Sequence, residues 1–155
     1  MNILKAIFFR LLKINKKPSA LEAFILNKIK ENLEEKEACL WEKQINDINK
    51  VYRSPDKEEI IFYRMRNGHP YNDISISFIN KSDEILIAKV LLTSVNNAAL
   101  SLEASVWCVN GFVSIINYNH GNYVDYFEEY IGEVGLDELA VECEILANLS
   151  ETVLN

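Results

Sequence analysis

The sequence predicts an α+β fold in which N-terminal helices pack on a largely antiparallel meander sheet of about five strands. Apolar residues recur at helical spacing in the first third of the chain, and they alternate at every second position between residues 84 and 118. Asn-Gly pairs at 67–68 and 110–111 punctuate the later runs, and this pair favours tight hairpins because both turn positions take positive φ. A length of 155 residues, 49% of them hydrophobic, indicates that residues 1–155 form a single domain.

Residues 1–17 predict a basic amphipathic helix, because apolar side chains recur near the helical period with lysine and arginine between them. A signal peptide is disfavoured, since Lys5 and Arg10 interrupt the apolar region and no small-residue cleavage site follows. Packing of this helix on the sheet is the favoured interpretation. A helix lying on a membrane surface stays open as the alternative.

Residues 19–52 are expected to be helical. Ser19 and Glu22 have the spacing of a capping box, which predicts that a helix begins there. Its apolar stripe continues past a charged segment near Glu34, so the pattern allows one long helix or two helices with a bend. The stripe comprises Leu21, Phe24, Ile25, Ile29, Leu33, Trp41, Ile45, Ile48 and Tyr52, with Trp41 expected in the core.

Residues 59–118 are expected to form the antiparallel sheet. Short links join the alternating runs, and short links favour antiparallel neighbours. The expected strands cover residues 60–65, 74–78, 85–95, 100–109 and 112–118.

Residues 119–155 form an acidic C-terminal region. Within it, residues 136–149 alternate like a strand but also fit a helical stripe, and their high helix propensity favours a helix.

No catalytic, cofactor-binding or metal-binding residue is expected. The phosphate-binding, dinucleotide-binding, serine-hydrolase and zinc-protease motifs do not occur in the sequence, and its three cysteines have no metal-ligand spacing. His69 and His120 lie in expected turns, where turn chemistry explains their neighbours. Cys39 and Cys108 are expected to be buried, and this use of cysteine favours a reducing cytoplasm.

Charge is distributed unevenly along the chain, although the net value is −7. Residues 1–30 carry seven basic residues and one acid, 7 − 1 = +6, whereas residues 67–155 carry two basic residues and thirteen acids, 2 − 13 = −11. The shortage of Lys and Arg in residues 67–155 disfavours nucleic acid as a partner of that half. A basic protein partner is favoured instead, because complementary fields speed encounter and set register.

The candidate binding site combines aromatic and acidic side chains of the segment 123–144 with one tryptophan. Trp107 either packs beneath the helix that begins near residue 20 or anchors an interface, since tryptophan is enriched at binding hot spots. The expected partner-binding residues are Tyr123, Asp125, Tyr126, Glu128, Glu129, Tyr130, Glu133, Asp137, Glu138 and Trp107.

The block from Glu59 to Tyr118 resembles small bacterial immunity proteins of contact-dependent and polymorphic toxin systems. The resemblance is carried by residues 60–64 (Ile-Ile-Phe-Tyr-Arg), 74–78 (Ile-Ser-Ile-Ser-Phe), 102–107 (Leu-Glu-Ala-Ser-Val-Trp) and 109–115 (Val-Asn-Gly-Phe-Val-Ser-Ile). It implies tight binding to a cognate toxin, often a basic nuclease, so that the toxin's active site is blocked.

The sequence therefore predicts a non-enzymatic cytoplasmic binding protein, with an immunity protein as the first hypothesis. A peripheral membrane protein anchored by residues 1–17 and an enzyme that uses His69 or His120 are the alternatives. Nothing in the pattern indicates an oligomeric state.

Overall fold

The computed structural model describes residues 16–133 and 139–152, and its class is α+β as predicted. Six strands form one sheet in the order β1-β2-β7-β6-β5-β8, and all neighbours are antiparallel. These strands are Lys50–Arg53 (β1), Glu59–Tyr63 (β2), Ile85–Ser94 (β5), Ser101–Val109 (β6), Phe112–Tyr118 (β7) and Leu139–Ile145 (β8). Met65–Arg66 (β3) and His69–Pro70 (β4) form a separate small hairpin.

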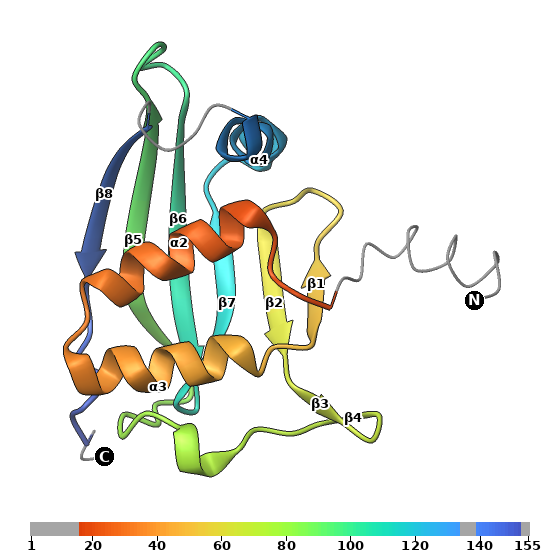
Figure 1. The fold of residues 1–155 in the computed structure, drawn as a ribbon, viewed down its shortest axis with the longest axis vertical. Helices are drawn as coiled ribbons and strands as arrows, with labels where there is room; N and C mark the ends of the chain where they lie inside the picture. The colour runs from red at the N-terminus through yellow and green to blue at the C-terminus, as the bar shows by residue number, and fades with distance from the viewer. Residues whose placement is uncertain (1–15, 134–138, 153–155) are drawn as a thin grey trace, which may run out of the picture.

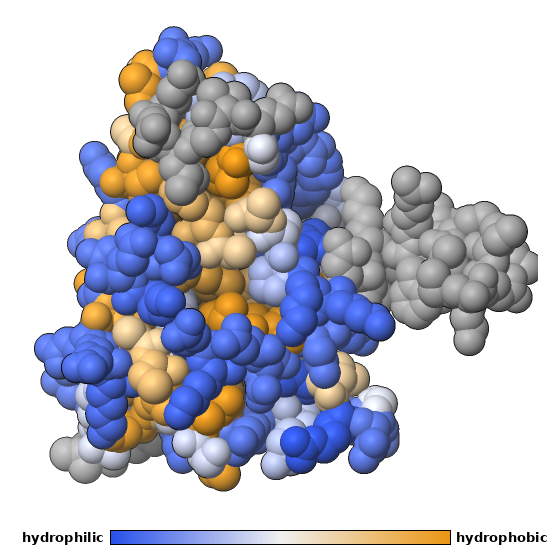
Figure 2. Space-filling view, viewed as in Figure 1, coloured by the Kyte–Doolittle hydropathy of each residue, from blue (hydrophilic) through white to orange (hydrophobic). Residues whose placement is uncertain are grey.

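Three helices in the described part of the chain cover one side of this sheet. Figure 1 shows α2 and α3 lying across the same face of the sheet, with α4 beyond the upper end of β7 and beside α2. Seen from that side, hydrophilic side chains cover the outer surface of the helices and apolar ones lie between them (Figure 2). The helices are Ala20–Glu31 (α2), Glu35–Asn46 (α3) and Val124–Glu133 (α4), and short 3-10 turns span Ile74–Ile76 (η1) and Gly121–Tyr123 (η2).

The capping box at the start of α2 is formed as predicted. The Ser19 hydroxyl accepts a hydrogen bond from the Glu22 amide at 3.2 Å, and a Glu22 carboxylate oxygen accepts from the Ser19 amide at 2.8 Å. Of the two arrangements left open for residues 19–52, the structure has two helices, because α2 ends before Asn32 and α3 begins after Glu34. The expected stripe is therefore divided between two helices, and its last members, Ile48 and Tyr52, lie beyond the end of α3.

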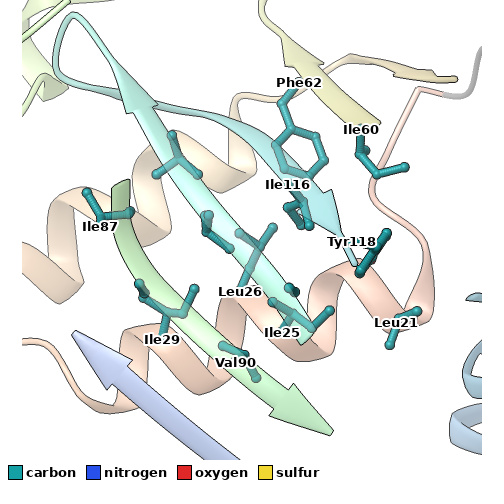
Figure 3. Close-up of a cluster of buried hydrophobic side chains, with 14 of the residues drawn as sticks. Leu21, Ile25, Leu26, Ile29, Ile60, Phe62, Ile87, Val90, Ile116 and Tyr118 are labelled. Carbon is teal, nitrogen blue, oxygen red and sulfur yellow. The ribbon is translucent and has the colours of Figure 1, made fainter. Parts of the chain in front are cut away.

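The core lies between α2, α3 and the sheet. Along β6, residues 102, 104, 106 and 108 are fully buried, as their alternation predicts, and Trp41 of α3 is buried as well. Figure 3 shows the side chains of α2 facing β5, β7 and β2 across this layer. The labelled residues are Leu21, Ile25, Leu26 and Ile29 of α2 and Ile60, Phe62, Ile87, Val90, Ile116 and Tyr118 of the sheet. Full burial of one such aliphatic side chain stabilises the fold by about 1.5–3 kcal/mol.

A buried cation ties the end of α3 to the sheet. Arg64, which follows β2, donates from Nε and Nη2 to the carbonyl of Gln44 at 3.1 and 3.0 Å and from Nη1 to the carbonyl of Val113 at 3.0 Å. Burial lowers the pKa of Arg64 to about 10. The carbonyls of the last turn of a helix carry partial negative charge, so this position stabilises the guanidinium.

Residues 74–78 do not form the predicted strand. Asp73 caps a 3-10 turn by accepting from the Ser75 amide at 3.0 Å, and Ile74 is 72% exposed. Only Phe78 of this segment is buried, against Trp41. Apolar and polar residues do alternate in this segment, but it pairs with no strand among the described residues. The Asp73 side chain accepts a backbone hydrogen bond of the turn instead.

Two further predictions of secondary structure were wrong. Residues 139–145, part of the stretch 136–149 for which a helix was favoured, form β8, and residues 50–52, expected to be helical, belong to β1. Each pairs with an otherwise open strand, β5 and β2 respectively. Backbone pairing at a sheet edge outweighs a helix propensity of a few tenths of a kcal/mol per residue. Cys39 was also misplaced, because it is exposed, whereas Cys108 is buried as expected.

Candidate functional site

The candidate functional site is the face of the sheet opposite α2 and α3, here called the open face. Among the described residues no helix covers it. Five apolar side chains on this face are cross-strand neighbours in one continuous line, here called the apolar row. Reading from β1 to β5, the register pairs Tyr52 with Ile61, Ile61 with Ile115, Ile115 with Trp107, and Trp107 with Leu86. The apolar row therefore crosses five of the six strands.

A second line of cross-strand neighbours, here called the polar row, runs beside the apolar row. It consists of Glu59, Asn117, Ser105, Lys89 and Glu144, and it extends from β2 to β8. On β2, β7 and β6 the two rows are two positions apart, which is the spacing of successive residues on one face of a strand, so the rows are adjacent. On β5 a bulge between Leu86 and Ala88 makes this spacing three positions. The open face is therefore amphipathic, and the boundary between its apolar and polar side chains runs across the strands.

The residues of the apolar row are partly exposed, and on β6 the residues that flank Trp107 in sequence are buried. Val106 and Cys108 flank Trp107 on β6 and are fully buried against the helices. Within the described residues the indole Nε1 of Trp107 is covered and has no acceptor. Tyr and Trp polar atoms usually find a hydrogen-bond partner when they are covered, so this donor is available to an acceptor from another chain segment.

Acidic residues outnumber basic ones on the open face. The two cations are occupied, because Lys89 Nζ lies 3.2 Å from a Glu103 carboxylate oxygen and Lys50 Nζ lies 5.5 Å from the centre of the Tyr63 ring. The acids of this face are Glu59, Glu103, Glu142 and Glu144, and the bases are Lys50 and Lys89, which gives 4 − 2 = 2 negative charges in excess.

The sequence-predicted acidic and aromatic segment forms α4, and much of it is engaged inside the protein. Tyr130 is buried together with Phe127, so its ring offers little area to a partner. Asp125 forms an ion pair with Lys57. Glu128 accepts a hydrogen bond from the Leu21 amide at the N-terminus of α2, at 3.2 Å. These two acids therefore serve the packing of α4 against its neighbours.

Tyr123, Tyr126 and Glu129 of this segment are at least partly exposed. Tyr126 packs edge-on against Phe127, Tyr123 packs edge-on against His120, and Glu129 is exposed. Glu133 ends α4, while Asp137 and Glu138 lie outside the described residues.

Trp107 and α4 lie on opposite sides of the sheet, so the predicted site residues do not form one surface. α4 packs beside α2 on the helix-covered side, where Phe127 joins the core. Trp107 points to the other side, so of its two alternatives, packing beneath the helix that begins near residue 20 was wrong. The reason is the two-residue period of β6, which directs Trp107 away from Val106 and Cys108.

Sequence reasoning missed four members of the apolar row, namely Tyr52, Ile61, Ile115 and Leu86. Alternation within its strand assigned Trp107 to the outer face. The same alternation assigns Ile61 and Ile115 to that face once the register between the strands is known. Local alternation cannot supply that register, because it depends on the pairing of β2 with β7, more than fifty residues apart.

A second cluster of side chains is polar and largely buried, and it lies on the side of the sheet that the helices cover. Arg53 of β1 donates from Nε and Nη2 to the two carboxylate oxygens of Glu22 at 2.7 and 2.8 Å. The Tyr118 hydroxyl is buried nearby and has no hydrogen-bond partner among the described residues. Burial, followed by the charges of Glu22 and Glu128, raises the pKa of Tyr118 well above its usual value. The ion pair of this cluster joins β1 to the first turn of α2.

The histidines and the possible metal ligands of the described residues are placed as follows. His69 and His120 are both exposed, on β4 and before η2. No group of three or more metal-ligating side chains is assembled within residues 16–133 and 139–152. None of the helices described here has the length and apolar character to cross a membrane.

Comparison of the chain with protein-family models, with curated proteins and with solved structures found no match.

Proposed function

We propose that this protein is a non-enzymatic binding protein that captures a basic protein partner on the open face of its sheet. The observation that carries the proposal is the apolar row with Trp107 inside it, on a face that no described helix covers. Monomeric proteins rarely expose a contiguous apolar patch without a use for it, and tryptophan is enriched where binding energy is concentrated.

The charge of this face supports a basic partner. The acids Glu142 and Glu144 on β8 are exposed, and Glu59 lies at the opposite end of the polar row. An apolar centre with a charged border is the common arrangement of protein interfaces. Complementary charge at that border accelerates association and sets orientation more than it raises affinity.

The resemblance to immunity proteins suggests what the partner is. Under this proposal the partner is a toxin domain, for example a nuclease, and the open face occludes its active site. An enzyme that binds nucleic acid carries a basic surface around its active site, which would meet the acidic border of the open face.

The test is a binding titration with the protein encoded beside this gene, followed by calorimetry. Trp107→Ser should weaken binding at least tenfold, because it removes the central anchor. Ile74→Ser is the matched control, since Ile74 is a highly exposed apolar residue on η1 and away from the rows. Equal affinity of the Trp107→Ser variant and the parent protein would reject the open face as the binding site.

The electrostatic part of the proposal has its own test. Reversing Glu142 and Glu144 to lysine should slow association and flatten its dependence on salt, while dissociation changes little. Reversal of Glu129, an exposed acid on α4, serves as the control. If reversing Glu129 slowed association more than reversing Glu142 and Glu144 did, the binding site would lie on α4 and not on the open face.

A further inference from the structure

The sheet has two edge strands, which differ in length and charge. β1 is four residues long and carries Lys50 and Arg53, whereas β8 is seven residues long and carries Glu142 and Glu144. Figure 1 shows β8 at the outer margin of the sheet, beside β5. An edge strand presents unpaired backbone N–H and C=O groups, with which another extended segment can pair.

The register of β8 on β5 determines which backbone groups of β8 are unpaired. The Leu146 amide donates to the Ile87 carbonyl at 2.8 Å, so the even-numbered residues of β8 form the hydrogen-bonded pairs with β5. The N–H and C=O groups of Val141, Cys143 and Ile145 therefore point away from β5. In the part of the chain that the structure describes, no strand pairs with β8 on that side.

The side chains of β8 divide between the two faces of the sheet. Val141, Cys143 and Ile145 lie on the helix side and pack partly against the core. Glu142 and Glu144 lie on the open face, are exposed, and form no ion pair within residues 16–133 and 139–152. The side chains of a segment paired with β8 would alternate in the same way, because residues opposite each other in a sheet share a face.

A cleft of about 450 Å³ adjoins the end of this edge. It lies between residues 145–150 and the connection from α2 to α3, which Figure 1 shows beside the end of β8. Glu34 and Glu37 line it, and the Ser150 hydroxyl donates to Glu37 across it. Carboxylates therefore flank the edge both on the open face and at the end of the strand.

We propose that β8 accepts an extended segment of the basic partner as an additional strand. Lysine or arginine would lie beside Glu142 and Glu144, and apolar side chains would lie beside Val141, Cys143 and Ile145. Backbone hydrogen bonds to the edge would provide affinity, and the alternating side chains would provide selectivity. That the segment belongs to the partner rests on the proposed function, whereas the capacity of the edge to bind such a segment does not.

Charge decides between a basic segment and a second copy of this chain. Two antiparallel β8 strands centred on Cys143 would place Glu142 of each strand opposite Glu144 of the other, and like charges directly opposite each other destabilise a strand pair. A basic segment would place opposite charges at the same positions. The two carboxylates therefore disfavour pairing of the edge with itself and favour a cationic strand.

Amide hydrogen exchange of the full chain with a probe peptide tests the pairing. The probe is Lys-Val-Lys-Val-Lys-Val-Lys. Without it, the amides of Val141, Cys143 and Ile145 should exchange rapidly, whereas those of Glu142 and Glu144, which are bonded to β5, should exchange slowly. The probe should slow exchange of the first three by about threefold or more and leave the other two unchanged.

Two outcomes of this exchange experiment would overturn the proposal. One is unaltered exchange of the three outward amides at millimolar probe. The other is protection of these amides without the probe that increases with protein concentration, because it would assign the edge to a second copy of the chain.

Modified probes separate backbone pairing from charge without altering the protein. N-methylation of the valines removes the donors that face β8 in the proposed register, so it should abolish protection. N-methylation of the lysines, whose amides face solvent in that register, should retain protection and is the matched control. A probe with glutamate in place of lysine should not protect. Equal protection by the two methylated probes would reject strand pairing, and equal protection by the glutamate probe would reject a basic segment.

Cys143→Pro blocks the edge from the side of the protein. It removes an outward N–H and leaves the hydrogen bonds between β8 and β5 in place, because the amide of Cys143 is not bonded to β5. The variant should weaken binding of the probe by about threefold or more. Cys143→Val retains the N–H, and it should bind the probe as the parent protein does. Equal binding by the proline and valine variants would contradict pairing at this edge.

Titration with the protein encoded beside this gene separates strand pairing from capture on the open face. If both sites contribute, Cys143→Pro and Trp107→Ser should each weaken binding of that protein. Weaker binding by Trp107→Ser alone would keep the proposed function and overturn the addition of a partner strand to β8. Weaker binding by Cys143→Pro alone, with Cys143→Val unchanged, would keep the strand addition and reject the open face.

Discussion

Arg53 on edge strand β1 and Glu22 in the first turn of α2 form a two-point ion pair beneath the helix layer, with nitrogen–oxygen distances of 2.7 and 2.8 Å. Glu22 also completes the capping box with Ser19, so one carboxylate orders both the start of α2 and the position of β1. Since β1 carries Tyr52, this pair also fixes one end of the apolar row on the opposite face.

Removing one partner of this pair should be costly. Glu22→Gln leaves the Arg53 guanidinium largely buried without its counter-charge, and we expect a loss of about 3 kcal/mol in the free energy of unfolding, measured in urea. The surface pair Lys28–Glu31 provides the comparison, and Glu31→Gln should cost less than about 0.5 kcal/mol. Similar losses for the two variants would show that the Glu22–Arg53 pair does not stabilise the fold.

Two consecutive residues of β7 should respond very differently to truncation. Ile116 is fully buried against the helices, so Ile116→Ala should cost about 2–5 kcal/mol through lost burial and the cavity left behind. Ile115 lies on the open face and is partly exposed, so Ile115→Ala should cost about 1 kcal/mol. Equal losses in chemical denaturation would contradict the assignment of these two side chains to opposite faces.

The two glycines of the Asn-Gly turns offer a matched test of packing. Gly111 has φ +87°, and a Cβ there would lie 3.0 Å from the Phe78 carbonyl oxygen, whereas Gly68 has φ +77° and open space around it. Gly68→Ala should cost about 1 kcal/mol for the left-handed backbone alone. Gly111→Ala should cost clearly more, because the Phe78 backbone must also shift, and thermal unfolding measures the difference.

Tyr118 predicts how stability depends on alkaline pH. In the unfolded chain a tyrosine ionises near pH 10, and in the folded protein burial raises the pKa of Tyr118 above that value. The unfolded state therefore loses its proton first, so the stability contributed by the neutral hydroxyl is complete below pH 10 and is lost as pH rises from there towards the folded-state pKa. Urea unfolding at several pH values from 8 to 11 should show this decline.

Tyr118→Phe is the variant that isolates this effect. Because the hydroxyl has no partner among the described residues, the variant should be as stable as the parent protein near pH 7 or slightly more stable. It should also lose less stability above pH 10. A residual decline is expected from Cys108, whose pKa is also raised by burial. An unchanged slope in the variant would assign the alkaline effect to other groups.

Local sequence was sufficient for the features whose partners lie a few residues away. The capping box of Ser19 and Glu22 and the Asn110-Gly111 turn with positive φ at both positions formed as predicted. The alternation that buries Val106 and exposes Trp107 in part was also correct. Each depends on one turn of helix or one strand period, so the neighbouring residues specify it.

Tertiary structure decided the features that depend on distant partners. Leu139–Ile145 became a strand because β5 offered an open edge, and residues 74–78 did not because no strand lay beside them. The candidate site changed for the same reason. The pairing of β2 with β7 and of β7 with β6 aligned Ile61, Ile115 and Trp107 across the open face, while the packing of α4 on α2 drew Glu128 and Tyr130 inward. A strand's own sequence states which side chains share a face, but only its hydrogen-bonded neighbours determine which residues meet there.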